Sequence, residues 1–142
     1  MNSELEVIAE TCACFHLRRV SRVVSAIYDD ALKPLGLRST QYVALLVAHL
    51  KPKATMSEVA EALSIDRTSF TRLMIPLKRK GLLKTVGGKD RRTLCVSITP
   101  KGEALLRKGI PYWSKVQSKV EQVYINPGWP ALLKNLQKID EL

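Results

Sequence analysis

Residues 66–81 read DRTSFTRLMIPLKRKG and residues 84–98 read KTVGGKDRRTLCVSI, and these two neighbouring stretches decide the fold. The apolar residues of the first recur at the spacing of one helix face: Phe70, Leu73, Met74 and Leu77. Asp66 can cap the start of this helix and Gly81 can end it. The second stretch has two short alternating runs around a Gly-Gly pair, a pattern typical of a β-hairpin.

A shorter helix is predicted just before these stretches. Thr55 and Glu58 have the spacing of a capping box, in which each side chain accepts a hydrogen bond from the other residue's backbone N–H. Ser64 and Ile65 then leave only a tight turn before the next helix. Two helices joined in this way, with a hairpin behind them, predict a winged helix–turn–helix. Pro76 removes one hydrogen bond from the second helix, and we expect a kink there rather than a break.

The rest of the chain is predicted to be helical, so the fold class is mainly α with a small β-hairpin wing. Apolar residues recur every three or four positions from Leu5 to Leu32, which predicts one helix of about 40 Å. Further helices are expected at 40–50, from 99 to about 125, and around Leu132. Because 142 residues cannot cover so long a helix within one monomer, the sequence predicts a homodimer.

The charge is concentrated near the predicted winged helix. The chain has 23 Lys and Arg against 13 Asp and Glu, a net charge of +10. Nine basic and two acidic residues lie between Asp66 and Arg92, a local net charge of +7. Such a concentration is an electrostatic footprint for phosphate, although a solvated basic face has the same composition.

Several other classes of protein are disfavoured. No apolar run approaches the length of a membrane span, and the acidic N-terminus does not resemble a secretory signal, so we expect a cytoplasmic protein. Cys12, Cys14 and His16 form a Cys-x-Cys-x-His run, but a zinc site needs a fourth ligand and His49 is the only other histidine. We therefore expect no metal and no cofactor. The absence of a catalytic motif predicts that the protein is not an enzyme.

The helix predicted over residues 67–80 is the candidate recognition helix. Arginine can bridge two acceptors on guanine, and Ser or Thr can contact phosphates, so these residue types at a helix start suit a DNA major groove. The candidate DNA contacts on this helix are Arg67, Thr68, Ser69, Thr71, Arg72 and Lys78. An ordinary amphipathic surface helix is the alternative.

The tip of the hairpin is the candidate wing. Its candidate DNA contacts are Lys89, Asp90, Arg91 and Arg92. Here Asp90 can hold one arginine in place while the other enters the minor groove or binds a phosphate. A solvated run of charges is the alternative.

Four motifs in a fixed order carry a family resemblance: DRTSFTR at 66–72, KGL at 80–82, DRR at 90–92 and ITPKG at 98–102. With them the chain resembles the MarR family over nearly its whole length. The resemblance implies a single 1–142 domain that forms a triangular homodimer. Segments 1–33 and 103–142 would form the dimerisation helices, and 38–101 the winged-helix lobe.

The resemblance also implies a function. Each subunit would offer one winged helix to half of a pseudopalindromic operator in duplex DNA. Such a sequence-specific transcription regulator is usually a repressor, and it releases DNA when a phenolic or other small molecule binds or when a cysteine is oxidised.

Cys14 and Tyr28 are similar to the start of the organic-hydroperoxide sensors in this family. That likeness implies that Cys14 is the oxidised thiol and that Tyr28 hydrogen-bonds to it. Fourteen residues along one helix separate the two side chains by about 21 Å, so they can meet only between antiparallel chains. Arg18 and Ser39 stand where the sensors have further tyrosines, and Cys14 as a small interface residue is the alternative.

A second kind of effector remains open. If Cys14 is not the sensor, we expect a small organic acid or phenol, bound where the dimer helices meet the winged helix. The candidate lining residues are His16, Arg18, Tyr42 and Trp113. Two rival functions are a peroxidase-like enzyme that uses Cys14 and a protein-interaction module on the same fold, although the basic recognition helix and wing disfavour the latter.

Overall fold

The computed structural model describes residues 3–90 and 92–141. Its elements, with η for a 3-10 helix, are α1 (Glu4–Thr11), α2 (Ala13–Leu32), η1 (Lys33–Leu35), α3 (Ser39–Leu50), α4 (Met56–Ala62), α5 (Arg67–Arg79), β1 (Leu83–Gly87), β2 (Leu94–Ile98), α6 (Pro100–Val123), α7 (Trp129–Gln137) and η2 (Lys138–Glu141). The predicted fold class, mostly helical with one antiparallel hairpin, is confirmed. Within these residues no helix combines the length and the apolar character needed to cross a membrane.

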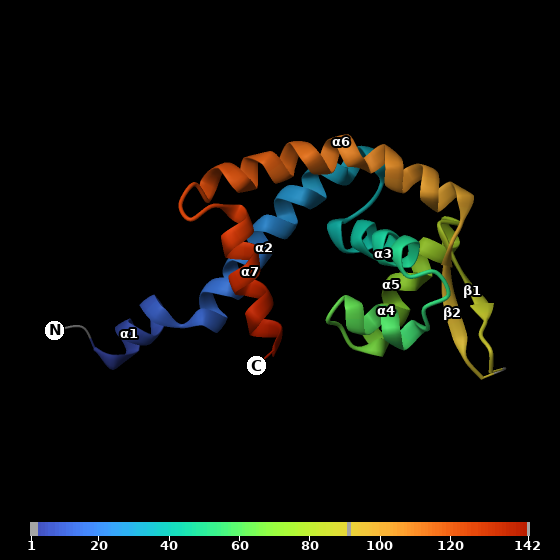
Figure 1. The fold of residues 1–142 in the computed structure, drawn as a ribbon, viewed down its shortest axis with the longest axis horizontal. Coiled ribbons are helices and arrows are strands. Elements are labelled where there is room, and N and C mark those ends of the chain that lie inside the picture. The colour runs from blue at the N-terminus through green and yellow to red at the C-terminus, as the bar shows by residue number, and fades with distance from the viewer. Residues whose placement is uncertain (1–2, 91, 142) are drawn as a thin grey trace.

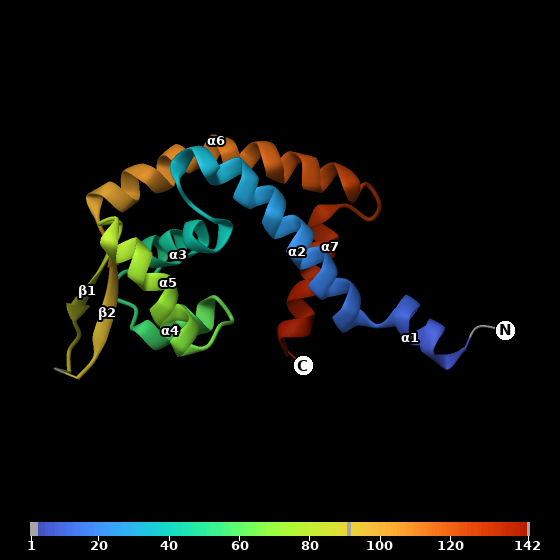
Figure 2. The same cartoon turned by 180° about the vertical axis from the view of Figure 1, so that it is seen from behind.

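Helix α6 spans the top of an arch (Figure 1). At its N-terminal end lie α3, α4, α5 and the β1–β2 hairpin, which we call the winged lobe. At its C-terminal end lie α1, α2 and α7, which we call the arm. Seen from behind, α2 rises beside α6 toward the crown of the arch (Figure 2). Helix α6 therefore connects the two regions.

The predicted single helix from Leu5 to Leu32 is wrong at one position. Cys12 adopts an extended backbone, with φ −65° and ψ 109°, and separates α1 from α2. The ring of His16 reaches back across this break, and its Nε2 donates to the carbonyl oxygens of Ala9 and Glu10 at 3.1 and 2.9 Å. These carbonyls lie at the C-terminal end of α1, where a helix lacks its own donors. The ring therefore holds the end of α1 against the start of α2.

The predicted helix–turn–helix is confirmed in detail. The Glu58 backbone N–H donates to Thr55 Oγ1 at 3.2 Å, and the Thr55 N–H donates to Glu58 Oε2 at 2.7 Å, which completes the capping box. Ser64 turns the chain with a left-handed φ of +52°. Pro76 lies inside α5, which continues unbroken to Arg79 as predicted.

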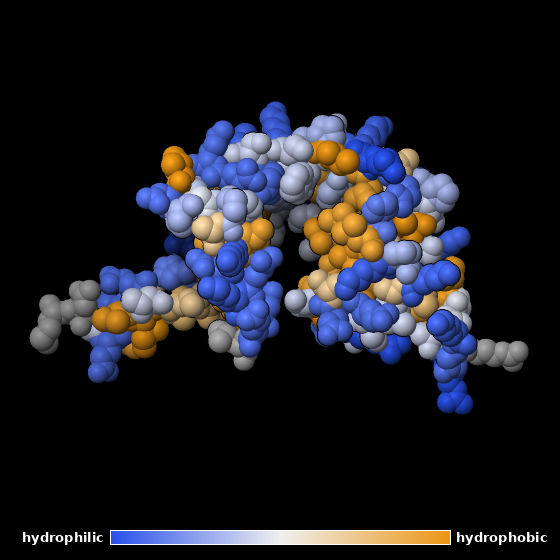
Figure 3. All heavy atoms as spheres, in the orientation of Figure 1, coloured by the Kyte–Doolittle hydropathy of each residue, from blue (hydrophilic) through white to orange (hydrophobic). Residues whose placement is uncertain are grey.

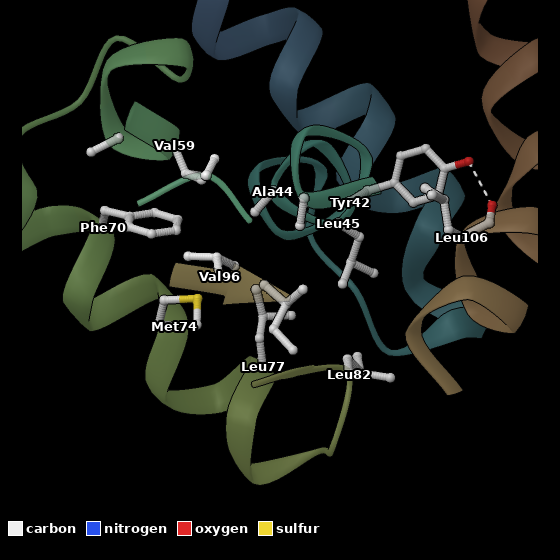
Figure 4. Close-up of a cluster of buried hydrophobic side chains, with 14 of the residues drawn as sticks. Tyr42, Ala44, Leu45, Val59, Phe70, Met74, Leu77, Leu82, Val96 and Leu106 are labelled. Atoms are coloured by element: carbon white, nitrogen blue, oxygen red, sulfur yellow. Dashed lines mark hydrogen bonds between the residues drawn. The ribbon is translucent and has the colours of Figure 1, made fainter. Parts of the chain in front are cut away.

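The apolar face of α5 builds the core of the winged lobe. Phe70, Met74 and Leu77 are at most 2% exposed, and they lie in one cluster with Val59 of α4 and Val96 of β2 (Figure 4). Complete burial of a side chain of this size stabilises the fold by about 1.5–3 kcal/mol. The core thus fixes which face of α5 is turned to solvent.

Tyr42 of α3 joins the winged lobe to α6. Its ring is buried, and its hydroxyl donates to the carbonyl oxygen of Leu106 at 2.9 Å (Figure 4). A Cβ at position 109 would lie 2.2 Å from the ring, so the close approach of α6 requires glycine there. Since Leu106 also belongs to the core, the start of the 103–142 segment is shared between the winged lobe and the arm.

The Ile98–Gly102 motif fixes the base of the wing to α6. Thr99 Oγ1 donates to the carbonyl oxygen of Gly81 at 2.6 Å and accepts from the Gly102 N–H at 3.0 Å. A Cβ at position 102 would lie 2.2 Å from the Leu82 carbonyl oxygen, which explains the glycine. The wing and α6 are therefore anchored to the same turn after α5.

Candidate nucleic-acid interface

The N-terminus of α5 is capped by a charged residue. Asp66 Oδ1 accepts from the backbone N–H of Ser69 at 2.9 Å, and Asp66 Oδ2 accepts from the Ser69 hydroxyl at 2.6 Å. These bonds hold the pKa of Asp66 below its ordinary value. The carboxylate is therefore ionised at neutral pH, and it fixes the start of the candidate recognition helix.

The exposed face of α5 carries five of the predicted contacts: Arg67, Thr68, Ser69, Thr71 and Arg72. Two of their hydroxyls already use their protons within the chain, because Ser69 donates to Asp66 and Thr71 Oγ1 donates to the Arg67 carbonyl oxygen at 2.8 Å. With these bonds intact, Ser69 and Thr71 can offer only acceptor lone pairs to a ligand. Among these five residues, the side chains that keep donors for a ligand are the two arginines and Thr68.

Lys78 lies further along α5 and contacts the wing. Its Nζ donates to Thr85 Oγ1 of β1 at 3.2 Å, so one ammonium group links the helix to the hairpin. Two other lysines bond to backbone carbonyl oxygens: Lys80 donates to Gly36 and Lys101 donates to Lys80. Within the 66–92 segment, Lys78 and Lys80 therefore use part of the local charge of +7 in contacts within the chain.

The wing tip is shaped by Asp90. Its Oδ1 accepts from the Arg92 backbone N–H at 3.1 Å, and its carbonyl oxygen accepts from the Thr93 N–H at 2.9 Å. The carboxylate of Asp90 thus orders the backbone at Arg92, and its predicted hold on an arginine side chain stays a prediction. Lys89 and Arg92 are exposed on either side, whereas Arg91 lies outside the described residues.

Cys14 and Tyr28 are not in contact within one chain. Cys14 is exposed in the first turn of α2, and the Tyr28 hydroxyl donates to Gln117 Oε1 of α6 at 2.5 Å. Burial, with Glu121 nearby, raises the pKa of Tyr28, so its hydroxyl stays protonated. Cys95, in contrast, is buried in β2, as expected for a packing residue.

A cavity of 140 Å³ lies where α2, α3 and α6 meet, the place predicted for an effector pocket. It is lined by Val24, Ser25, Tyr28, Leu32, Ser39, Tyr42, Val43 and Trp113. Of the four candidate pocket residues, Tyr42 and Trp113 therefore share this cavity. The ring of His16, in the first turn of α2, instead bonds to the end of α1. Arg18 lines a separate groove with Phe15 and Arg22, so the chain brings neither residue to this cavity.

The arm exposes a large apolar surface. On α1 and α2 the exposed apolar side chains are Leu5, Val7, Ile8, Phe15, Leu17, Val20, Val23 and Ile27. Figure 3 shows apolar residues at the surface of α1, at the free end of the arm. Large exposed apolar patches are typical of interaction sites. The described residues contain no cluster of ligands able to hold a metal ion.

Comparison with known proteins agrees with this geometry. Residues 40–102 match the family model described as a winged helix DNA-binding domain. The transcriptional regulator MosR of M. tuberculosis, solved in complex with DNA, is 35% identical, with 92% of this chain and 95% of that chain covered and a TM-score of 0.84.

Two further solved structures share the fold at lower identity. Bordetella bronchiseptica BpsR, whose DNA binding is regulated by 6-hydroxynicotinic acid, is 23% identical, with coverages of 94% and 96% and a TM-score of 0.84. A MarR-family transcriptional regulator from Rhodococcus is 20% identical, with coverages of 98% and 94% and a TM-score of 0.73.

The fold and the basic face of α5 define a winged helix DNA-binding protein, which acts as a transcription regulator. The chain belongs to the MarR family of winged helix regulators, as its likeness to MosR shows. Regulators of this family bind DNA as dimers, in agreement with the two partners predicted from the sequence, duplex DNA and a second copy of the chain.

Proposed function

We propose that this protein is a repressor that binds a pseudopalindromic operator as a homodimer and releases it in response to an effector. The observation that carries the proposal is the exposed basic face of α5, fixed by the Asp66 cap and flanked by the wing. The dimer is proposed to form through segments 1–33 and 103–142, and the apolar surface of the arm supports this. Two such lobes would present two recognition helices to successive major grooves.

The experiment is selection of bound duplexes from a random pool, followed by affinity measurements at several salt concentrations. A pseudopalindromic consensus and a steep fall of affinity with salt are expected, because each phosphate contact releases counterions. Arg92→Ala should weaken binding. Lys134→Ala, on α7 of the arm, also removes one exposed positive charge and is the control. Equal affinity of Arg92→Ala and the unchanged protein would remove the wing from the proposal.

For the effector, the cavity between α2, α3 and α6 favours a small aromatic acid or phenol. Tyr28, Tyr42 and Trp113 offer aromatic surface there, and the DNA binding of the relative BpsR is regulated by 6-hydroxynicotinic acid. A panel of aromatic acids added to the protein–DNA complex should include one that releases it. Trp113→Ala should abolish that release while Trp129→Ala, on α7, should retain it.

Oxidation of Cys14 is a second candidate signal, favoured by the exposure of its thiol. Cumene hydroperoxide should then release DNA from the unchanged protein and from Cys95→Ser, but not from Cys14→Ser. Release that persists in Cys14→Ser would exclude this thiol as the sensor.

We further infer that the protein is a regulator rather than a thiol peroxidase. Its family comprises transcription regulators, and the basic α5 gives it a DNA target. A single equivalent of hydroperoxide should be consumed per reactive thiol. Continuous consumption in the presence of a reductant would support the enzyme instead.

A further inference from the structure

A carboxylate of the arm caps the first helix of the winged lobe. Asp29, near the end of α2, accepts from both the backbone N–H and the hydroxyl of Ser39, the first residue of α3, with 2.6 Å from Oδ1 to each donor atom. Hydrogen bonds to an ionised acceptor are roughly twice as strong as bonds between neutral groups. They lower the pKa of Asp29, so the carboxylate is charged at neutral pH.

Helix α3 has no acceptor side chain at its N-cap position. An N-cap residue normally accepts a hydrogen bond through a short side-chain oxygen, but Arg38 occupies that position and its guanidinium can only donate. Gln41 Oε1 accepts from the Arg38 N–H at 3.0 Å and leaves the Ser39 N–H free for another partner. That partner comes from α2, which lies ten residues earlier in the chain.

This contact lies at the joint between the two regions. Residue 28 of α2 is bonded to Gln117 of α6, and Tyr42 of α3 is bonded to Leu106 of α6, so both helices are tied to α6 separately. Between α2 and α3 the chain turns through η1 and Gly36, whose φ is +66°. The Asp29–Ser39 bonds close this turn and fix the direction in which α3 leaves the arm.

We propose that Asp29 is a positioning residue that sets which half-site spacing the dimer accepts. This inference rests on the proposed function, because it requires two winged lobes on one operator. Half-sites lie about one helical turn, or 34 Å, apart, and a lobe that rotates at the joint moves its recognition helix out of register. The Asp29–Ser39 contact holds the angle between arm and winged lobe at the value that fits one spacing.

The chain supplies a matched control at the next position. Asp30 is exposed, and its carboxylate pairs with Lys33 of the adjacent η1 at 2.6 Å. Asp29→Asn and Asp30→Asn therefore remove the same charge one residue apart. Ser39→Ala removes only the hydroxyl donor and retains the backbone donor, so its effect should be smaller than that of Asp29→Asn.

The first measurement uses the selected operator and two derivatives with one base pair added or removed between the half-sites. The unchanged protein and Asp30→Asn should prefer the original spacing at least tenfold. In Asp29→Asn this preference should fall several-fold, with the order of preferred half-site sequences retained. A uniform loss of affinity at all three spacings, or an undiminished preference, would overturn the proposal.

The second measurement needs no DNA. A spin label at Arg79→Cys, at the exposed end of α5, in a chain whose three native cysteines are replaced by Ser, reports the distance between the two recognition helices of a dimer. The distance distribution should be narrow for this protein and broader once Asp29→Asn or Ser39→Ala is added. Distributions that all coincide would overturn the positioning role, whereas the absence of any pair distance would count against the proposed dimer itself.

Discussion

The winged lobe and the arm differ in how completely one chain can bury them. In the winged lobe Phe70, Leu77, Val59 and Val96 are all fully buried by neighbours from the same chain. In the arm, α1 and α7 contain no buried residue and α2 contains only Leu32. A region with its own core can fold alone, whereas helices with exposed apolar faces require a partner to cover them. The winged lobe thus has a core within one chain, whereas the arm leaves the large apolar side chains of α1 and α2 exposed.

The largest change in stability is expected from a substitution in the core of the winged lobe. Phe70→Ala should lower the free energy of unfolding by about 3–5 kcal/mol, because it leaves a cavity in a closely packed cluster. Denaturant unfolding followed by circular dichroism measures the change. Phe15→Ala, in the exposed surface of α2, is the control and should leave the unfolding of the lobe nearly unaffected.

A charge introduced on the arm should weaken dimerisation and leave the winged lobe folded. Val20→Asp places a carboxylate on the apolar face of α2 and should weaken dimerisation on the order of 100-fold, since burial of an unpaired charge costs several kcal/mol. Sedimentation velocity should show monomers whose lobe still unfolds cooperatively. Dimers of unchanged stability would mean that this face of α2 is not the interface.

Loss of a single contact on α5 should act on the DNA complex alone. Arg72→Ala should reduce the binding free energy by about 1–3 kcal/mol and relax the preference at one base pair of each half-site. Binding titrations against operators with single substitutions measure both changes. Lys108→Ala, an exposed residue of α6, should leave the pattern of preferences unaltered.

The smallest effect concerns the cap of α5 and depends on pH. The folded-state pKa of Asp66 lies below its ordinary value of 3.8, so its contribution to stability is present above that value and is lost as the pH falls through the lowered pKa. Asp66→Ala should therefore lower Tm slightly at pH 7, and the difference should shrink below pH 3.8. A difference in Tm that stays constant to pH 2 would contradict this assignment.

Most of the winged lobe could be predicted because its signals are local. Thr55 and Asp66 act on residues three positions away, and the apolar spacing of α5 directly reports its buried face. The break at Cys12 was missed because the apolar spacing continues across it, and spacing alone does not record the backbone angles of one residue.

The candidate sites were foreseen less completely. Tyr42 and Trp113 do share one cavity, because the fold packs α3 against α6. Asp29 was not singled out, since a carboxylate that caps a helix of another segment leaves no pattern in the sequence. The bond from Asp90 to the Arg92 backbone likewise depends on the turn geometry of the wing tip rather than on residue types.

Helix α6 has a mechanical consequence. It runs through 24 residues, with Pro111 inside it, from the wing base to the arm, a length of about 36 Å. Over that length a tilt of about 5° at one end corresponds to a displacement of about 3 Å at the other. This is close to the 3.4 Å rise between base pairs in duplex DNA. A movement of a few degrees between the arms of two protomers can therefore shift a wing by about one base-pair step along the DNA.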